Sequence, residues 1–327
     1  MAEPKQGPHV DAVTGAFSYT GRFIARRLLE AGRRVRTLTN HSHRPGAEDV
    51  EAAVEVEPLR FDDRARLIAS LRGVDVLYNT YWVRFPHAGQ DFDLAVANTR
   101  ILISAAEAAG VRKIVHISVS NPSLDSPLPY YAGKARTEEL VRQSSLDWAI
   151  VRPTLVFGNG DILINNIAWM LRRMPVFAMP GLGHYRVQPV AIEDVADIAF
   201  DAANATENVT YDAAGPETVT YAELVDEIAI AVRRRPPFVY VPPGMVIFSG
   251  RVLGMFLRDV VLTKDELAGL MSDLLVSNEP PRGQRKLDDW LLREADRVGQ
   301  SYASELERHF RLPEPLVSRT GPRPARP

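Results

Sequence analysis

The chain has 327 residues, of which 46% are hydrophobic and 24% are charged, and its net charge is −2. This composition is ordinary for a globular protein, and the near-neutral charge argues against wholesale attraction to nucleic acid. The absence of cysteine excludes disulfides and thiolate metal sites, and it fits a reducing compartment. No apolar run reaches the ~18 residues of a spanning helix, and the histidines lack a metal-ligand spacing, so we expect no metal. Residues 1–8 lack a signal-peptide core, so we expect a cytoplasmic protein.

Strands and helices alternate along the first half of the chain. The predicted strands are residues 9–14, 34–39, 54–61, 74–79, 113–118 and 148–152. The predicted helices between them are residues 20–31, 62–71, 92–109 and 130–143. This alternation predicts an α/β fold, a doubly wound parallel Rossmann sheet that binds ligands at the carboxyl ends of its strands.

The pattern loosens after Pro153, where we expect a smaller C-terminal lid. The predicted helices are residues 161–173, 193–203, 221–234, 244–257 and 264–275, and the predicted short strands are 176–179, 185–189, 209–213 and 238–241. We therefore divide the chain into a dinucleotide-binding domain (9–155), a substrate region with elements that return to the sheet (156–312) and a disordered tail (313–327). The apolar stretch 245–257 is expected to pack on the lid or a second subunit, with contact to a membrane surface as the alternative.

A glycine-bearing turn follows the first predicted strand. Gly15 permits a tight turn and Gly21 permits close contact between helix and strand, whereas Ser18 stands at the middle position of the dinucleotide fingerprint. A pyrophosphate would lie at the amino end of the following helix, where N–H groups and the helix dipole favour an anion. The predicted cofactor contacts in this turn are Gly15, Phe17, Ser18, Tyr19, Thr20 and Gly21.

The residues after the second and third strands bear on the choice of cofactor. The second strand is followed by Asn40, His41 and Arg44 and by no acidic residue, which favours the 2′-phosphate of NADP over the free ribose of NAD. Asp62 follows the third strand. It is either an acceptor for the adenine amino group or a helix N-cap.

The fourth strand is followed by an aromatic loop where the cofactor ribose and nicotinamide would pass. Thr80 and Tyr81 are predicted cofactor contacts, and Trp82 and Arg84 are predicted to wall the substrate pocket and to hold an anionic group. The alternative is that this loop contacts the lid or another subunit.

Tyr130 and Lys134 are four residues apart and share one face of a predicted helix. An ammonium near a phenol lowers the phenol pKa, so Tyr130 is the candidate proton donor or acceptor and Lys134 its tuning partner. Lys134 is also a predicted cofactor contact, because a lysine can bind the ribose hydroxyls. Ser120 is predicted to hydrogen-bond the substrate oxygen, and Ser118 is the alternate serine or a cofactor contact. Low-priority substrate candidates complete the set, namely Tyr131, His184 and Arg186.

With these residues assembled, the chain resembles the short-chain dehydrogenase/reductase superfamily over residues 9–292. The resemblance is to its extended or atypical branch, which includes NmrA-like proteins and relatives of the 39-kDa subunit of respiratory complex I. It implies NAD(P) binding, a Ser120–Tyr130–Lys134 triad, and Pro153 beside the nicotinamide. The loop between Ser120 and Tyr130 is shorter than in sugar-nucleotide epimerases, which argues against a nucleotide-sugar substrate.

The sequence thus predicts an NADP-preferring, or NAD-using, oxidoreductase or epimerase that acts on a secondary alcohol or ketone. A non-catalytic NAD(P)H-sensing or assembly protein is the second hypothesis, and a membrane-associated accessory subunit is the third. A homodimer through residues 92–109 and 130–143 and a monomer both stay open.

Overall fold

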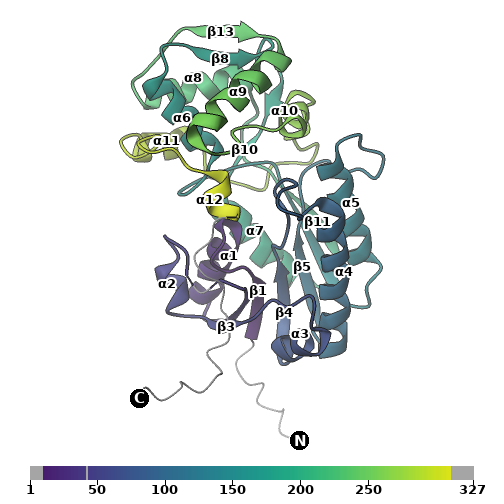
Figure 1. Ribbon diagram of the computed structural model, residues 1–327. Coiled ribbons are helices and arrows are strands. Elements are labelled where there is room, and N and C mark those ends of the chain that lie inside the picture. Colours follow the sequence, from purple (N-terminus) through teal and green to yellow (C-terminus); the bar gives the residue numbers. More distant parts are fainter. Residues whose placement is uncertain (1–9, 42, 311–327) are drawn as a thin grey trace, which may run out of the picture.

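The computed structural model describes residues 10–41 and 43–310, and its centre is one parallel sheet (Figure 1). The seven strands in spatial order are β11 (Val209–Ala213), β6 (Asp147–Pro153), β5 (Lys113–Ile117), β4 (Val74–Asn79), β1 (Val10–Thr14), β2 (Arg34–Leu38) and β3 (Glu55–Glu57). Every pairing in this sheet is parallel. The predicted doubly wound fold is therefore confirmed, and the strand order reverses next to β1, where such sheets bind ligands.

Helices cover both faces of the sheet. On one face, α1 (Tyr19–Glu30) and α7 (Ile192–Asn204) pack over a core that includes Val13 and Leu28, with the short α2 (Glu48–Glu51) beside α1. On the other face, α3 (Arg64–Leu71), α4 (Phe92–Ala109) and α5 (Pro129–Arg142) enclose a core around Leu77. Burial on both faces explains why these strands read as near-continuous apolar runs.

The remaining elements form a lid (residues 154–191 and 214–299) above the carboxyl edge of the sheet (Figure 1). Its strand pairs are β7 (Leu155–Phe157) with β10 (Pro189–Ala191), β8 (Phe177–Pro180) with β13 (Phe238–Val241), and β9 (Arg186–Val187) with β12 (Val219–Thr220). Its helices are α6 (Leu163–Arg173), α8 (Tyr221–Ala231), α9 (Pro243–Leu257), α10 (Lys264–Met271) and α11 (Leu287–Glu294). They share a core of their own that includes Leu224, Ile228 and Trp290.

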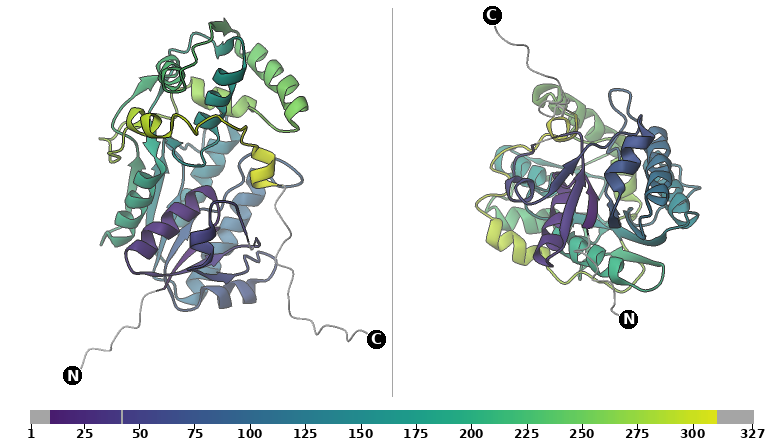
Figure 2. Two further views of the ribbon diagram at one scale, coloured as in Figure 1. Left: turned by 90° about the vertical axis from the view of Figure 1, so that its left-hand side faces the viewer. Right: turned by 90° about the horizontal axis from the view of Figure 1, so that it is seen from below.

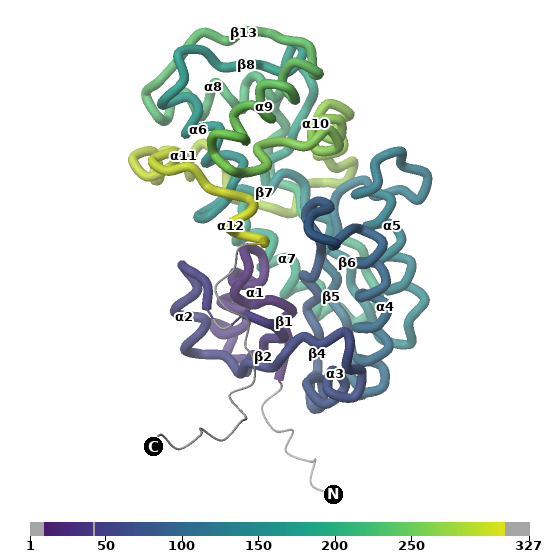
Figure 3. The backbone as a smooth tube through the Cα atoms, viewed as in Figure 1, coloured from purple at the N-terminus to yellow at the C-terminus, as the bar shows by residue number. Residues whose placement is uncertain are grey.

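Residues 300–310 form a C-terminal strap that carries α12 (Glu305–His309). The strap runs from the lid down to the amino end of α1, as the smooth trace makes plain (Figures 2 and 3). The alternation of strands and helices in the sequence predicts β1, α1 and the sheet, but it does not predict the strap. The predicted tail 313–327 lies outside the described residues.

Two predicted elements are shorter in the structure for local reasons. The third strand, predicted over 54–61, ends at Glu57 because Pro58 has no N–H for the ladder. The helix predicted over 264–275 ends at Met271, since Asp273 adopts a left-handed φ of 55°. The Asp273 carboxylate then accepts a hydrogen bond from the backbone of Arg186 at 2.6 Å, which joins α10 to β9.

Only part of α9 packs on the lid. Ile247 and Gly254 are its buried residues, whereas Phe248, Met255 and Phe256 are 70%, 70% and 82% exposed. The expected packing of this stretch on the lid thus accounts for one side of the helix and leaves an apolar side uncovered. Among the described residues, no helix is long and apolar enough to cross a bilayer.

Candidate active site

The turn between β1 and α1 requires glycine at its two ends. Gly15 has a left-handed φ of 67°, and a Cβ on Gly21 would lie 2.2 Å from the Gly15 carbonyl oxygen. Ser18, in contrast, has φ −75° and ψ 170°, an ordinary extended conformation that any residue adopts. The serine at the middle fingerprint position therefore costs the turn nothing in backbone strain. Its side chain makes no capping hydrogen bond to α1.

The loop after β4 is tied to the end of β1. The Thr80 backbone N–H donates to Thr14 Oγ1 at 2.8 Å, and the Tyr81 N–H donates to the same oxygen at 3.1 Å. The Tyr81 hydroxyl accepts a hydrogen bond from Asn98 of α4, and its ring packs on Phe61. These contacts place Thr80 and Tyr81 beside the glycine turn, as their predicted cofactor role requires.

The residues predicted to choose between NAD and NADP lie together after β2. The Asn40 amide donates to the Leu59 carbonyl at 2.8 Å, so its side chain fixes the neighbouring loop. His41 is half-buried, and its Nδ1 has no hydrogen-bond partner in the part of the chain that the structure describes. Burial together with Arg44 lowers the pKa of His41. Arg44 is half-buried, and its guanidinium donates to the Arg308 carbonyl of the strap at 3.1 Å.

Asp62 is not the N-cap of α3. Asp63 is, because its carboxylate accepts from the Arg66 N–H at 3.0 Å. Asp62 lies on the surface in an ion pair with Arg60 at 2.9 Å. One of the two sequence interpretations of Asp62 is thereby wrong, and the adenine contact stays a prediction.

Tyr130 and Lys134 occupy one face of α5, near the carboxyl end of β5. Lys134 is buried, and its Nζ donates to the Ile117 carbonyl at 2.9 Å and lies 4.6 Å from the centre of the Trp82 ring. Burial lowers the pKa of Lys134 to about 7, with Glu138 opposing the shift. Lys134 therefore exchanges its proton near neutral pH.

Tyr130 is surrounded by aromatic rings. Its ring centre lies 5.9 Å from that of Trp82, 5.8 Å from Phe92 and 5.5 Å from Tyr131. Burial raises the pKa of Tyr130, Arg84 opposes this rise and Glu266 adds to it. We expected Lys134 to lower the phenol pKa, and in the structure burial has the opposite effect. Burial is the largest cause of this rise, and the Lys134 ammonium contacts the Ile117 carbonyl and the Trp82 ring.

Gly133 makes room for Trp82. A Cβ on Gly133 would lie 2.9 Å from the Trp82 ring, so the indole packs directly on α5 between Tyr130 and Lys134. The indole stacks on Phe92 with ring centres 5.8 Å apart, and its buried Nε1 has no hydrogen-bond partner among the described residues. Trp82, predicted as a substrate residue, is thus adjacent to both members of the Tyr–Lys pair.

The two candidate serines differ in what their hydroxyls do. Ser120 is fully buried, and its Oγ donates to the Leu274 carbonyl of the lid at 2.6 Å. The Ser120 N–H donates to the carbonyl of Pro153, which ends β6. The Ser118 hydroxyl is buried, and a hydrogen bond from it helps to lower the pKa of Glu138 on α5. Ser118 therefore faces Glu138, and Ser120 joins the sheet to the lid.

The other substrate candidates have structural partners. Arg84 makes ion pairs with Glu266 of α10 at 2.6 Å and Glu305 of α12 at 3.4 Å, in line with the lid-contact alternative. The Tyr131 ring packs against Gly269 of α10. His184 and Arg186 lie on the lid surface, where Arg186 pairs with Asp273 at 3.1 Å.

The sequence analysis missed the strap and the arginines that it brings together. Arg308 of α12 lies 5.8 Å above the Tyr19 ring, and its Nη1 donates to the Gly160 carbonyl at 2.6 Å. Arg22 of α1 donates to the Asn159 carbonyl at 2.7 Å. The signal for α12 was present, since Ser304 precedes Glu307 by three residues and accepts a hydrogen bond from its N–H.

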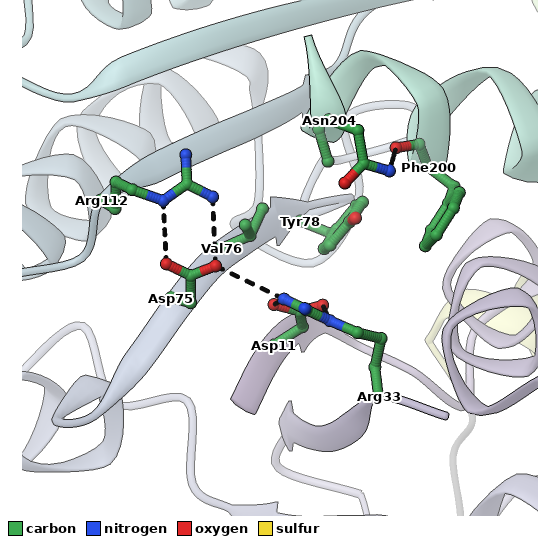
Figure 4. A pocket seen from close by; sticks show the side chains of 9 residues that line it. Asp11, Arg33, Asp75, Val76, Tyr78, Arg112, Phe200 and Asn204 are labelled. Atoms are coloured by element: carbon green, nitrogen blue, oxygen red, sulfur yellow. Dashed lines mark hydrogen bonds and ion pairs between the residues drawn. The ribbon is translucent and has the colours of Figure 1, made fainter. Parts of the chain in front are cut away.

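A cavity of about 320 Å³ lies at the opposite, amino edge of the sheet (Figure 4). Its charged side chains are paired with one another. Arg33 binds Asp11 through two hydrogen bonds of 2.7 and 2.8 Å, and Arg112 binds Asp75 at 2.9 and 3.1 Å. Ligands of open α/β sheets bind at the carboxyl edge, so this cavity does not belong to the candidate site. Within the described residues, no group of acidic or histidine side chains is placed to hold a metal ion.

The chain is similar to NAD(P)H-binding proteins of known sequence. The NAD(P)H-binding family matches residues 15–164. The mitochondrial 40 kDa subunit of NADH-ubiquinone oxidoreductase from Neurospora crassa is 28% identical, over 84% of this chain and 73% of its own. The (4-alkanoyl-5-oxo-2,5-dihydrofuran-3-yl)methyl phosphate reductase of Streptomyces griseus is 30% identical, over 68% of this chain and 73% of its own.

Solved structures share the fold at low identity. The NADPH-dependent quinone oxidoreductase QOR2 from Escherichia coli, complexed with NADPH, has a TM-score of 0.69 at 18% identity and covers 88% of this chain and 98% of its own. MoeE5 in complex with UDP-glucose and NAD has a TM-score of 0.63 at 17% identity and covers 88% of this chain and 97% of its own.

Proposed function

Because the chain belongs to the extended and atypical branch of the short-chain dehydrogenase/reductase superfamily, with NmrA-like proteins and relatives of the complex I 39-kDa subunit, we propose that it is an NAD(P)-dependent oxidoreductase or epimerase. Its substrate is a secondary alcohol or ketone. The observation that carries the proposal is the position of Lys134, whose Nζ lies 2.9 Å from the carbonyl oxygen that ends β5, one helical turn from Tyr130.

The residues at the carboxyl edge fit a dinucleotide. A Cβ at Gly21 would collide with the turn, and the hydroxyl of Tyr19, the first residue of α1, is buried without a partner among the described residues. Buried polar groups normally have a hydrogen-bond partner, so unpartnered ones around a helix amino end support a ligand there. The predicted cofactor contacts from Gly15 to Gly21 would hold the diphosphate.

The chain's own residues divide the work of the reaction. A bound nicotinamide supplies or accepts the hydride. The Tyr130 hydroxyl exchanges a proton with the substrate oxygen, and Ser118 or Ser120 donates a hydrogen bond to that oxygen. Lys134 would stabilise the deprotonated phenol by turning its ammonium from the Ile117 carbonyl toward Tyr130, and aromatic rings surround the phenol. Pro153, at the end of β6, is proposed to border the nicotinamide.

The test measures turnover of a panel of ketones and secondary alcohols by the wild-type protein and by Tyr→Phe variants. With NADPH and NADH, we expect Tyr130→Phe to lower turnover by about 100-fold or more, the usual contribution of a positioned acid or base. Cofactor affinity should stay unchanged. The control is Tyr240→Phe, which removes an exposed hydroxyl on the lid. Undiminished turnover in Tyr130→Phe, or a loss confined to Tyr131→Phe, would contradict the assignment of Tyr130.

A second candidate function is a non-catalytic NAD(P)H-binding subunit. It is favoured by the uncovered apolar side of α9 around Phe248 and Phe256, because contiguous exposed apolar surface is typical of interfaces. The 40 kDa relative from Neurospora crassa is named as a subunit of a larger oxidoreductase. Dinucleotide binding without turnover of any substrate in the panel would favour this candidate over the first.

Preference for NADP is proposed from the residues after β2. His41 and Arg44 lie there and no acidic side chain takes the position that would bind a free ribose 2′-hydroxyl. The cytoplasmic location, the homodimer and the division at residue 155 stay predictions.

A further inference from the structure

Three arginines converge on the amino end of α1 from three separate parts of the chain. Arg22 belongs to α1, Arg44 follows β2, and Arg308 comes from the strap. Arg44 and Arg308 are 264 residues apart in sequence, yet the Arg44 guanidinium reaches the Arg308 backbone carbonyl. In Figure 1 α12 lies above α1, and the Arg308 guanidinium lies 5.8 Å from the centre of the Tyr19 ring at the amino end of α1.

None of these three guanidiniums has a carboxylate partner among the described residues. Arg22 donates to the carbonyls of Gly46 and Asn159, Arg44 to that of Arg308, and Arg308 to that of Gly160. Each is half-buried, and burial lowers the pKa of each. Glu305 and Asp161 offset part of the charge of Arg308, whereas Arg22 and Arg44 are each repelled by Arg308. An added anion would therefore stabilise the cluster.

Unpartnered polar atoms point to the same spot. The Tyr19 hydroxyl and Arg22 Nε are buried without hydrogen-bond partners among the described residues. The Arg308 guanidinium lies over the Tyr19 ring at 5.8 Å and that of Arg22 at 5.7 Å, so both cations lie against this residue. Because Tyr19 is the first residue of α1, these donors lie near the helix end at which the glycine turn would place a diphosphate.

The strap is anchored on both sides of the glycine turn. On the β4 side, Glu305 pairs with Arg84, and the Phe310 ring packs on Phe85 and His87. On the β2 side, it contacts Arg44. From the lid, Asp259 accepts from the N–H groups of Glu305 and Leu306 at 2.9 and 2.8 Å. The strap thus crosses over the end of β1.

We propose that the strap is part of the cofactor site, and that Arg308 together with Arg22 binds the diphosphate of the dinucleotide at the amino end of α1. This rests on the proposed function, since it takes the dinucleotide as the ligand. Arg44, nearer the end of β2, is assigned to the 2′-phosphate. A guanidinium on a diphosphate forms charge-assisted hydrogen bonds, and the strap would close over the cofactor once it is bound.

The experiment titrates the full chain with NADH and with NADPH and follows dinucleotide fluorescence. We expect Arg308→Gln to weaken binding of both dinucleotides by about tenfold or more, and Arg308→Lys to weaken it less. Arg44→Gln should weaken NADPH binding more than NADH binding. The matched control is Arg297→Gln, which removes one charge from an arginine whose side chain is 83% exposed. Circular dichroism establishes that each variant is folded.

Hydrogen exchange gives a readout that is independent of affinity. Residues 302–310 should exchange more slowly in wild-type protein when NADH is bound. Wild-type affinity in Arg308→Gln, tighter binding in that variant, or faster exchange of the strap with NADH would each overturn the strap's role while the proposed function stands. Failure of the wild-type chain to bind either dinucleotide would overturn both.

Discussion

Arginines lie at both edges of the sheet, but two at the carboxyl edge lack the carboxylate partners that two at the amino edge have among the described residues. At the amino edge, Arg33 and Arg112 are satisfied by Asp11 and Asp75 in two-pronged ion pairs (Figure 4). At the carboxyl edge, Arg22 and Arg308 donate only to backbone carbonyls, and the Tyr19 hydroxyl has no partner among the described residues. The first edge is a closed structural network, and the second leaves donors for a ligand.

The two ends of β5 repeat this contrast with lysines. Lys113 begins the strand and donates to the Ala205 carbonyl at 2.7 Å, whereas Lys134 approaches its other end, at Ile117. Both are buried, and burial lowers the pKa of both. Only Lys134 has the candidate acid–base residue one turn away. Burial of a charge is therefore informative only together with the groups that surround it.

The largest expected effect breaks the amino edge. Asp11→Asn removes the charge from a side chain that is 1% exposed and leaves Arg33 without its main partner. We expect the free energy of unfolding to fall by about 4 kcal/mol, with dinucleotide affinity unchanged in the folded protein. Urea unfolding measures the first and fluorescence titration the second. Asp49→Asn is the control, because Asp49 is 57% exposed in its pair with Arg26 and should cost under ~1 kcal/mol.

A smaller effect at the carboxyl edge would sharpen the comparison. Gly21→Ala places a Cβ 2.2 Å from the Gly15 carbonyl oxygen, so the turn must shift. We expect a loss of about 2 kcal/mol in unfolding free energy and loss of dinucleotide binding. Gly250→Ala, in α9 with no heavy atom within 4 Å of the new Cβ, should be neutral or stabilising by up to ~1 kcal/mol. Normal dinucleotide affinity in a folded Gly21→Ala protein would be contrary to this account.

The smallest effect concerns the pH dependence of stability. The pKa of Lys134 is about 7 in the folded chain and 10.5 in its ordinary state, so the unfolded chain binds more protons between these values. Stability therefore rises with pH through this window, by about 1 kcal/mol between pH 7 and pH 8, and is lost as pH falls.

The comparison of Lys134→Met with wild type isolates this contribution. Urea unfolding at several pH values should give a stability difference that grows from pH 7 upward. Lys264→Met, at an exposed lysine of α10, is the matched control for the loss of a lysine side chain. Parallel pH profiles for Lys134→Met and wild type would show that the Lys134 ammonium is not disfavoured by folding.

Local sequence patterns predicted most of the strands and helices of the sheet domain. The strand 74–79 and the helix 92–109 have the bounds that the sequence predicts. Asp91 caps that helix and Gly110 ends it with a left-handed φ of 77°. The glycine turn and the shared face of Tyr130 and Lys134 were also readable, because they depend on short spacings within one unit of strand and helix.

Long-range contacts explain what the sequence could not predict. The ion pair between Arg84 and Glu305 joins residues 221 apart, and no local period links them. The Lys134 ammonium lies over the ring of Trp82, which belongs to the loop after β4. The spacing of Tyr130 and Lys134 alone predicts a lowered pKa for Tyr130. The sequence does not show that aromatic rings from other elements bury Tyr130, and this burial raises its pKa.

The bond from Ser120 to the lid has a consequence for turnover. Its Oγ donates to the Leu274 carbonyl at 2.6 Å, and Asn121 donates to that same carbonyl at 2.9 Å. If Ser120 donates a hydrogen bond to the substrate, an incoming ketone must displace the Leu274 carbonyl of the lid from the Ser120 hydroxyl. Opening of the lid and binding of the substrate would then depend on the same hydrogen-bond donor, Ser120. The hydrogen bond from Ser120 to Leu274 would form again when the product leaves.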